Sequence, residues 1–273
     1  MIKEVLSTFI RHPSLIVYSL SNPDLSSLKN RIKELRKRDR QRELTEIKLQ
    51  AIGKKEKIFT FNGKIYEYFY HDYNTTWAGE RTVEIPIIWE MVKEQRSRGA
   101  KILEVGNVLS HYFNSNHTVV DKFERWPGVI NEDILSFNPE EKFDLIVSIS
   151  TLEHIGWSLK RGVEDPEGFS KAVAKLRMLL NEGGQIWFTV PIGYNPYVDE
   201  VLRRGALNDA EMFFMKRTSY DNKWLQCDFS QVADYPYGGF KIRKRKRFPF
   251  PKANAIAIVR MYSKNNLKVP ISS

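Results

Sequence analysis

The early part of the chain shows two different periods of hydrophobic positions. Over residues 25–51 apolar side chains recur every three or four residues, which predicts one long helix with a narrow apolar stripe. Over residues 56–73 apolar and polar residues partly alternate on both sides of Asn62-Gly63, a dipeptide typical of tight turns. The pattern therefore predicts a helix followed by a β-hairpin or aromatic cap.

An amphipathic segment and a buried strand come next. Residues 83–95 have one apolar face and predict a helix that ends before Gly99. The apolar run 102–105 contains one acid, Glu104, and is closed by Gly106, as expected of a buried parallel strand that ends in a turn facing a ligand. A carboxylate in such a strand costs desolvation energy unless it is paired, so this strand end is a candidate binding edge.

Later apolar runs predict the rest of an α/β sheet. We expect strands at residues 117–121, 129–134, 143–150, 185–190, 212–215 and 253–262, and a helix at 169–180. The second of these strands follows the first too closely for a crossover helix of about a dozen residues, so that crossover is expected to be abbreviated.

The predicted elements divide the chain into two parts. Residues 1–82 form an N-terminal helical arm with the aromatic cap, and residues 83–273 form the α/β domain, with an insertion at 193–250 on the substrate side. Just ahead of the sheet, Glu80 and Arg81 could fold over a ligand at its edge or cap the sheet with salt bridges.

Composition indicates a globular protein with 42% hydrophobic residues among 273. The single Cys227 excludes an internal disulfide framework, and no cysteine and histidine cluster has zinc-ligand spacing, so we expect no metal site. Arg11, His12 and Pro13 split the apolar start, which is too short for a membrane span and lacks the pattern of a signal peptide. We expect a cytoplasmic protein whose start packs against the domain or makes a peripheral membrane contact.

The positive charge is concentrated in two segments. The formal net charge is +10, and residues 29–48 hold nine basic and four acidic side chains while residues 241–247 hold six basic ones and no acid. For residues 29–48 we expect a solvated helix that projects from the domain or a dimerisation arm, with nucleic-acid or anionic-membrane binding as alternatives. The second could hold an anionic small molecule or glycan, contact nucleic-acid phosphates, or protect an edge strand. Nucleic acid is the less favoured partner.

Over about residues 83–262 the order of motifs resembles the class I S-adenosylmethionine-dependent methyltransferases. The matching segments are residues 103–106, 119–121, 132–134, 143–154 and 180–184. The resemblance implies a Rossmann-like methyltransferase fold, with a mostly parallel central sheet and a late antiparallel strand. It also implies S-adenosylmethionine as the cofactor and an enzyme of the EC 2.1.1 class. A looser resemblance to a microbial subgroup associated with cell-surface glycan synthesis favours O-methylation of a glycan or another polar metabolite.

The resemblance also implies the residues that bind the cofactor. Those residues are Glu104, Gly106, Asn107, Asp121, Asp133, Ile134 and Ser150. Glu104 would orient the methionine amino end through the loop, Asp121 would hold the ribose, and Asp133 and Ile134 would contact the adenine. Each acid has an alternative role as a helix cap or turn former.

His154 is the candidate general base because it follows the carboxyl end of the 143–150 strand, where open α/β sheets bind ligands. Glu153 is the alternative base, and a structural role for His154 in capping that strand stays open. A nucleic-acid-binding methyltransferase and a non-catalytic interaction protein on the same fold are the alternative functions.

The glycine loop departs from the family pattern. Val108 and Ser110 stand where the family usually has two more glycines after Gly106. A pyrophosphate would need close backbone approach there, which argues against a dinucleotide cofactor. S-adenosylmethionine carries no phosphate, so the turn at Gly106 can suffice.

Overall fold

The computed structural model describes residues 8–21, 24–53, 56–158, 162–207, 209–238 and 248–263. Contacts divide the chain into two compact units, Met1–Gly53 and Lys54–Ser273. The basic segment 241–247, expected on the substrate side, lies outside the described residues.

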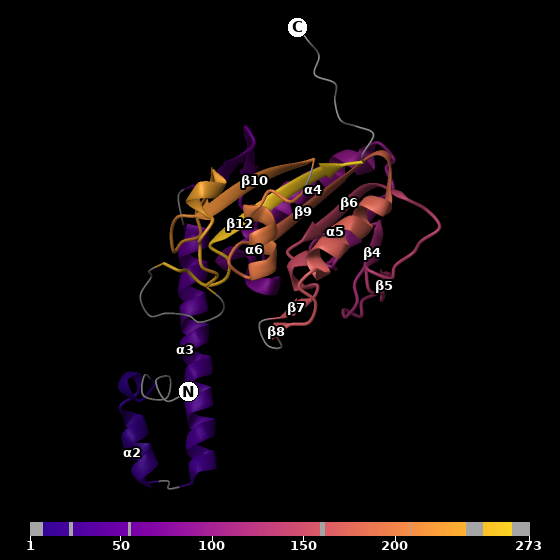
Figure 1. Cartoon of the computed structure of the whole chain (residues 1–273). Helices are drawn as coiled ribbons and strands as arrows, with labels where there is room; N and C mark the ends of the chain where they lie inside the picture. The colour runs from indigo at the N-terminus through magenta and orange to yellow at the C-terminus, as the bar shows by residue number, and fades with distance from the viewer. Residues whose placement is uncertain are drawn as a thin grey trace. The chain divides into compact units, whose positions relative to one another are not determined.

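The first unit contains a helical hairpin of α2 (Ser14–Ser21) and α3 (Leu25–Gly53), which confirms the predicted long helix. Figure 1 shows α2 running beside the first half of α3. Leu15 of α2 packs with Ile32 and Leu35 of α3. The oxygens of Tyr18 and Ser27 lie 2.5 Å apart, which holds the two helices together near the connection between them.

An eight-stranded mixed sheet forms the centre of the second unit. Its strands are β3 (Ile102–Val105), β4 (Thr118–Val120), β5 (Val129–Ile130), β6 (Phe143–Ile149), β9 (Leu180–Pro191), β10 (Ala210–Arg217), β11 (Trp224–Cys227) and β12 (Ala255–Tyr262). They lie in the order β11-β10-β12-β9-β6-β3-β4-β5. The strands from β5 to β9 pair in parallel, and β12 pairs antiparallel with both β9 and β10. The predicted late antiparallel strand is confirmed, and the chain passes from β4 to β5 without a helix, as expected.

The remaining elements surround this sheet. The helices are α4 (Arg81–Ser97), α5 (Gly168–Met178) and α6 (Pro196–Arg203), and the short 3₁₀ turns are η1 (Tyr73–Ala78), η2 (Leu109–His111), η3 (Leu152–His154) and η4 (Phe229–Gln231). Two small hairpins pair β1 (Ile58–Phe61) with β2 (Lys64–Glu67) and β7 (Trp157–Ser158) with β8 (Gly162–Val163). The sequence analysis predicted the first hairpin but not α6, β11 or the second hairpin.

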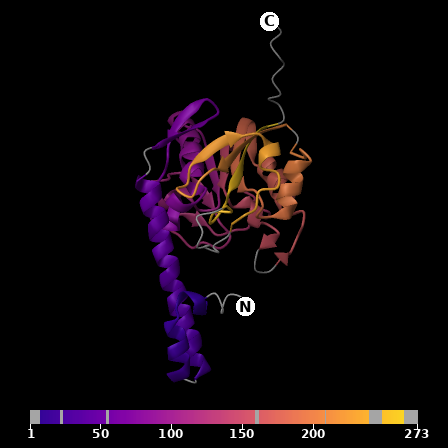
Figure 2. The same ribbon diagram turned by 90° about the vertical axis from the view of Figure 1, so that its left-hand side faces the viewer.

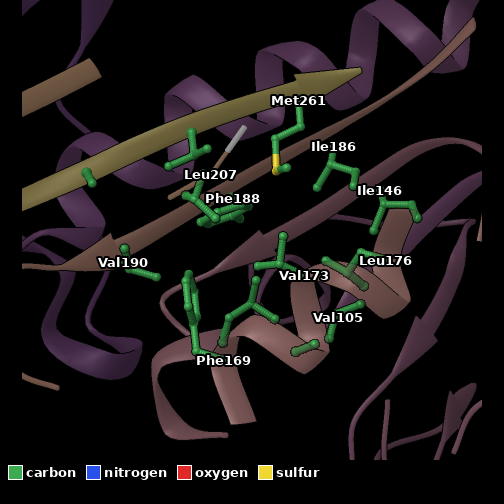
Figure 3. Close-up of a cluster of buried hydrophobic side chains, with 14 of the residues drawn as sticks. Val105, Ile146, Phe169, Val173, Leu176, Ile186, Phe188, Val190, Leu207 and Met261 are labelled. Carbon is green, nitrogen blue, oxygen red and sulfur yellow. The ribbon is translucent and has the colours of Figure 1, made fainter. Parts of the chain in front are cut away.

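Both faces of the sheet are buried because its central strands are apolar at almost every position. Leu145, Val147 and Ile149 belong to the core on the side of α4 and the first hairpin. Ile146 belongs to the core on the side of α5 and α6. Figure 2 shows the purple first hairpin and the orange α6 on opposite sides of the late strands. In Figure 3, Phe169, Val173 and Leu176 of α5 gather with Ile186 and Phe188 of β9.

The first hairpin packs within the sheet unit. The ring of Phe61 meets that of Phe213 edge-on at 5.3 Å, and the hydroxyl of Tyr68 accepts a 3.0 Å hydrogen bond from the Trp224 amide. The sequence analysis grouped the hairpin with the N-terminal arm in residues 1–82, whereas contacts place residues 54–82 in the compact unit that contains the sheet.

Candidate cofactor and active site

A cavity of about 760 Å³ lies at the carboxyl ends of β3 and β4 and beside the turn after β6. The candidate residues in its lining are Gly106, Asn107, Asp121, Asp133, Ile134 and His154. Glu104, Ser150 and Glu153 are buried and are absent from that lining. The structure therefore brings six of the nine candidates to one surface and places the other three behind it.

Gly106 forms the turn after β3 in a conformation that suits glycine. Its φ is +86°, and a Cβ atom there would overlap the side chain of Thr151. Its amide donates a 2.9 Å hydrogen bond to the Val120 carbonyl. The backbone of this turn can therefore face the cavity closely only because it carries no side chain.

Replacing Gly106 by Ala should destabilise the fold more than replacing Gly128, which has a φ of +82° and open space around its Cβ position. A left-handed conformation costs an L-residue about 1–2 kcal/mol at either site. Overlap with Thr151 should add about 1–3 kcal/mol at Gly106. Urea unfolding of the two variants measures the difference, and equal losses would contradict the packing that we describe.

Glu104 holds the loop that follows this turn. Its Oε1 accepts hydrogen bonds from the amides of Val108 and Leu109 at 2.8 and 2.7 Å. Its Oε2 lies 2.8 Å from Nε2 of His117, and the Glu104 side chain has no exposed surface. A contact with a ligand in the cavity would thus run through the loop, and His117 is a partner that the sequence analysis did not identify.

Asp121 closes the loop from the β4 side. Its Oδ1 accepts the amides of Phe123 and Glu124, both at 2.8 Å, and its Oδ2 accepts the amide of Asn107 at 3.2 Å. An ionised carboxylate offers about four acceptor positions. Asp121 is therefore a turn former that retains an acceptor position for a hydroxyl group in the cavity.

The altered loop uses its own polar groups internally. The Ser110 hydroxyl donates to the side-chain oxygen of Asn107, whose Nδ2 donates to Glu124 at 3.1 Å. Nε2 of His111 lies 2.6 Å from the same Glu124 oxygen, and the ring of Tyr73 stacks on His111 at 4.2 Å. Ser110, which stands where the family it resembles usually has a glycine, thus fixes Asn107. The stacked rings of Tyr73 and His111 form an aromatic border of the cavity.

Asp133 and Ile134 lie beside one another in the cavity wall. Asp133 pairs with Lys122 at 2.8 Å and accepts the Leu135 amide at 3.0 Å. Burial raises the pKa of Asp133, but the hydrogen bonds from Lys122 and Leu135 outweigh it and hold the pKa below its usual value. Asp133 is therefore an ionised acceptor, next to the apolar surface of Ile134.

Arg81 reaches the cavity from the first turn of α4. Its guanidinium donates to the Ile149 carbonyl at 2.7 Å and lies 3.4 Å from Glu84, a buried acid whose pKa is raised by desolvation. The Ser150 hydroxyl donates to the same carboxyl group at 2.5 Å, and Ser150 has a φ of +39°. Ser150 therefore supports Arg81 from behind the cavity in a strained backbone conformation.

His154 and Glu153 occupy different environments. The His154 side chain is 52% exposed at the cavity, and its Nδ1 shares a 3.0 Å hydrogen bond with the Tyr194 hydroxyl. Partial burial and the charge of Arg81 lower the pKa of His154. Desolvation raises the pKa of Glu153 well above its usual value, and its Oε2 has no hydrogen-bond partner among the described residues. His154 is thus the better placed of the two bases.

The strand order decides the fold. The five strands from β5 to β9 are parallel, and their sequence order along the sheet reverses between β3 and β6. The late β12 is inserted antiparallel between β9 and β10. The chain has the class I methyltransferase fold. In this fold ligands bind at the carboxyl ends of the strands where the order reverses, and the cavity beside β3 lies there.

Solved structures with similar folds include several methyltransferases. NodS, an N-methyltransferase from Bradyrhizobium japonicum WM9 in complex with S-adenosyl-L-homocysteine, is 18% identical, with 64% of this chain and 85% of that chain covered at a TM-score of 0.36. A possible histamine N-methyltransferase from Thermotoga maritima is 11% identical, with 66% and 96% covered at 0.35. The glycopeptide N-methyltransferase MtfA is 10% identical, with 63% and 88% covered at 0.34.

No family model and no curated protein matches the chain. The fold assignment therefore rests on strand order and register. Within the described ranges, no group of three or more His, Cys, Asp and Glu side chains is arranged to hold a metal ion. The helices that the structure describes include none long and apolar enough to cross a membrane.

Proposed function

We propose that this protein is an S-adenosylmethionine-dependent methyltransferase that methylates a hydroxyl group of a glycan or another polar metabolite. The observation that carries the proposal is the convergence of Gly106, Asp121, Asp133 and His154 on one cavity from the ends of successive strands. These positions are the ones that the family resemblance implies for cofactor binding and catalysis.

The charge of the cavity fits this cofactor. Its described lining contains the carboxylates of Asp121, Glu124, Glu132, Asp133, Glu164 and Asp165, against the cationic side chains of Arg81 and Lys122. Such an excess of negative charge favours a ligand with a permanent sulfonium charge. The guanidinium of Arg81 is the charge that would pair with a methionine carboxylate.

The remaining lining groups match the other parts of the cofactor. Asp121 would accept ribose hydroxyls at its remaining acceptor position, and Asp133 would accept the adenine amino group while Ile134 contacts the ring. Glu104 would act indirectly, because it fixes the amides of the loop that faces the cavity. When bound, the cofactor would supply an electrophilic methyl group.

His154 would remove the proton from the acceptor hydroxyl while the oxygen of that hydroxyl attacks the methyl carbon. A lowered pKa keeps its imidazole neutral near pH 7, so that one ring nitrogen can accept a proton. If Nδ1 donates to the Tyr194 oxygen, Nε2 is left as that acceptor. Tyr194 would thus position the base and set its tautomer.

Calorimetric titration with S-adenosylmethionine and its demethylated product tests the proposal. The wild type should bind both, and Asp121→Ala should weaken binding by about 10- to 100-fold, the value of hydrogen bonds to a charged group. Asp234→Ala removes a carboxylate that is 95% exposed and should leave affinity unchanged. Absence of binding by the folded wild type would favour a non-catalytic interaction protein on this fold.

A further inference from the structure

The N-terminal helical hairpin exposes apolar side chains on the face of α2 that does not pack on α3. Leu15 is 1% exposed in the contact with α3, whereas Ile16 and Leu20, one turn apart, are 53% and 81% exposed. Leu25, at the start of α3, is 69% exposed. No acidic or basic residue occurs in α2. Large apolar side chains exposed on one short helix and at the start of the next mark a candidate interaction surface.

This surface is small for a second copy of the chain. An eight-residue helix is about 12 Å long. A stable protein interface buries about 800 Å² and about 20–30 residues on each partner. A bilayer surface has no such minimum, because a few inserted side chains add to the attraction of nearby charges.

The charges near this surface fit an anionic partner. Over residues 8–33 the sequence contains four basic residues, Arg11, Lys29, Arg31 and Lys33, against the single acid Asp24. Arg11 pairs with Asp39 and Arg31 with Glu34, both at 3.4 Å, so the attraction to an anionic partner rests on Lys29 and Lys33. Asp24 caps α3, because its carboxylate accepts the amides of Ser26 and Ser27. Lys29 lies one helical turn after Leu25, and Lys33 follows one turn later. Basic residues beside inserted apolar side chains are attracted to anionic headgroups.

We propose that α2 and the start of α3 bind peripherally to an anionic lipid surface. Ile16, Leu20 and Leu25 enter the boundary between headgroups and acyl chains, and Lys29 and Lys33 lie at the level of the headgroups. This interaction is independent of the function proposed for the cavity, so either can fail without the other.

This inference is tested by flotation of the full chain with two kinds of vesicle. One is phosphatidylcholine alone, and the other also contains about 30% phosphatidylglycerol, which makes its surface strongly anionic. The wild type should float with the anionic vesicles, and its binding should fall as salt is added. Leu20→Glu and Leu25→Glu should each reduce partitioning by about tenfold or more, because each variant loses the burial of one leucine side chain. Leu49→Glu is the matched control, because Leu49 also lies on α3 and is 68% exposed, and it should bind like the wild type.

Three results would overturn the inference. They are absence of binding to the anionic vesicles, equal loss in Leu25→Glu and Leu49→Glu, and a lipid-free dimer in sedimentation equilibrium that Leu20→Glu dissociates. Circular dichroism should show that the variants fold, because the replaced side chains are exposed. The last of the three results would assign the surface to a second copy of this chain.

Discussion

Replacing His154 by Ala should slow methyl transfer by about 10²–10⁴-fold, the usual contribution of a general base. The affinity for S-adenosylmethionine should stay within about twofold, since hydrogen bonds made by other residues would hold the cofactor. Transfer of labelled methyl groups to a panel of mono- and oligosaccharides measures the rate, and calorimetry measures the affinity. Wild-type turnover in the variant would remove His154 from the mechanism, and a parallel loss of affinity would assign it a structural role.

The pH profile provides a second test of His154. Because burial and Arg81 lower its pKa below the usual 6.5, the imidazole is protonated and inactive only at acidic pH. The rate should therefore rise with pH through that lowered pKa and be level at neutrality. Tyr194→Phe removes the hydroxyl that contacts Nδ1 and should lower the rate less than His154→Ala does, with a shift in this profile.

Replacing Glu104 by Ala should lower the free energy of unfolding by about 3–5 kcal/mol, because each buried donor left without its acceptor costs about 1–3 kcal/mol. The variant leaves the amides of Val108 and Leu109 and the ring of His117 without their acceptor. Urea unfolding followed by fluorescence measures the loss.

The matched control for Glu104 is Glu141→Ala. Glu141 is 69% exposed and pairs with Lys101 at 2.9 Å, so its loss should cost no more than about 1 kcal/mol. Similar losses in the two variants would show that the loop after β3 does not depend on the Glu104 carboxylate.

The sheet could be predicted because its signals are local. The runs that form β3 and β6 are apolar and are closed by turn residues, so each identifies a buried strand without knowledge of its neighbours. The acids at the strand ends could be placed near one another because parallel strands share one carboxyl edge. The order of the motifs carried the family resemblance, which then implied the roles of these acids.

The parts that the sequence did not predict depend on contacts distant in the chain. Tyr194 reaches His154 across 40 positions. The contact of Arg81 with the Ile149 carbonyl at the cavity likewise could not be derived from the sequence, which left two roles open for Arg81. The strand β11 has only four residues and two exposed positions, so its apolar pattern is weak. A local signal for α6 was present, since Asn195 caps the helix and Pro196 begins it.

The position of β12 has a consequence for how the nascent chain folds during synthesis. This strand comes last among the described strands, yet it lies between β9 and β10 and pairs with both. Until residue 262 has emerged from the ribosome, β12 cannot join these two strands, and each of them presents an unpaired edge. The sheet therefore completes its core only after residue 262 has been synthesised, and until then the half-made sheet is exposed to aggregation and depends on the protection of chaperones.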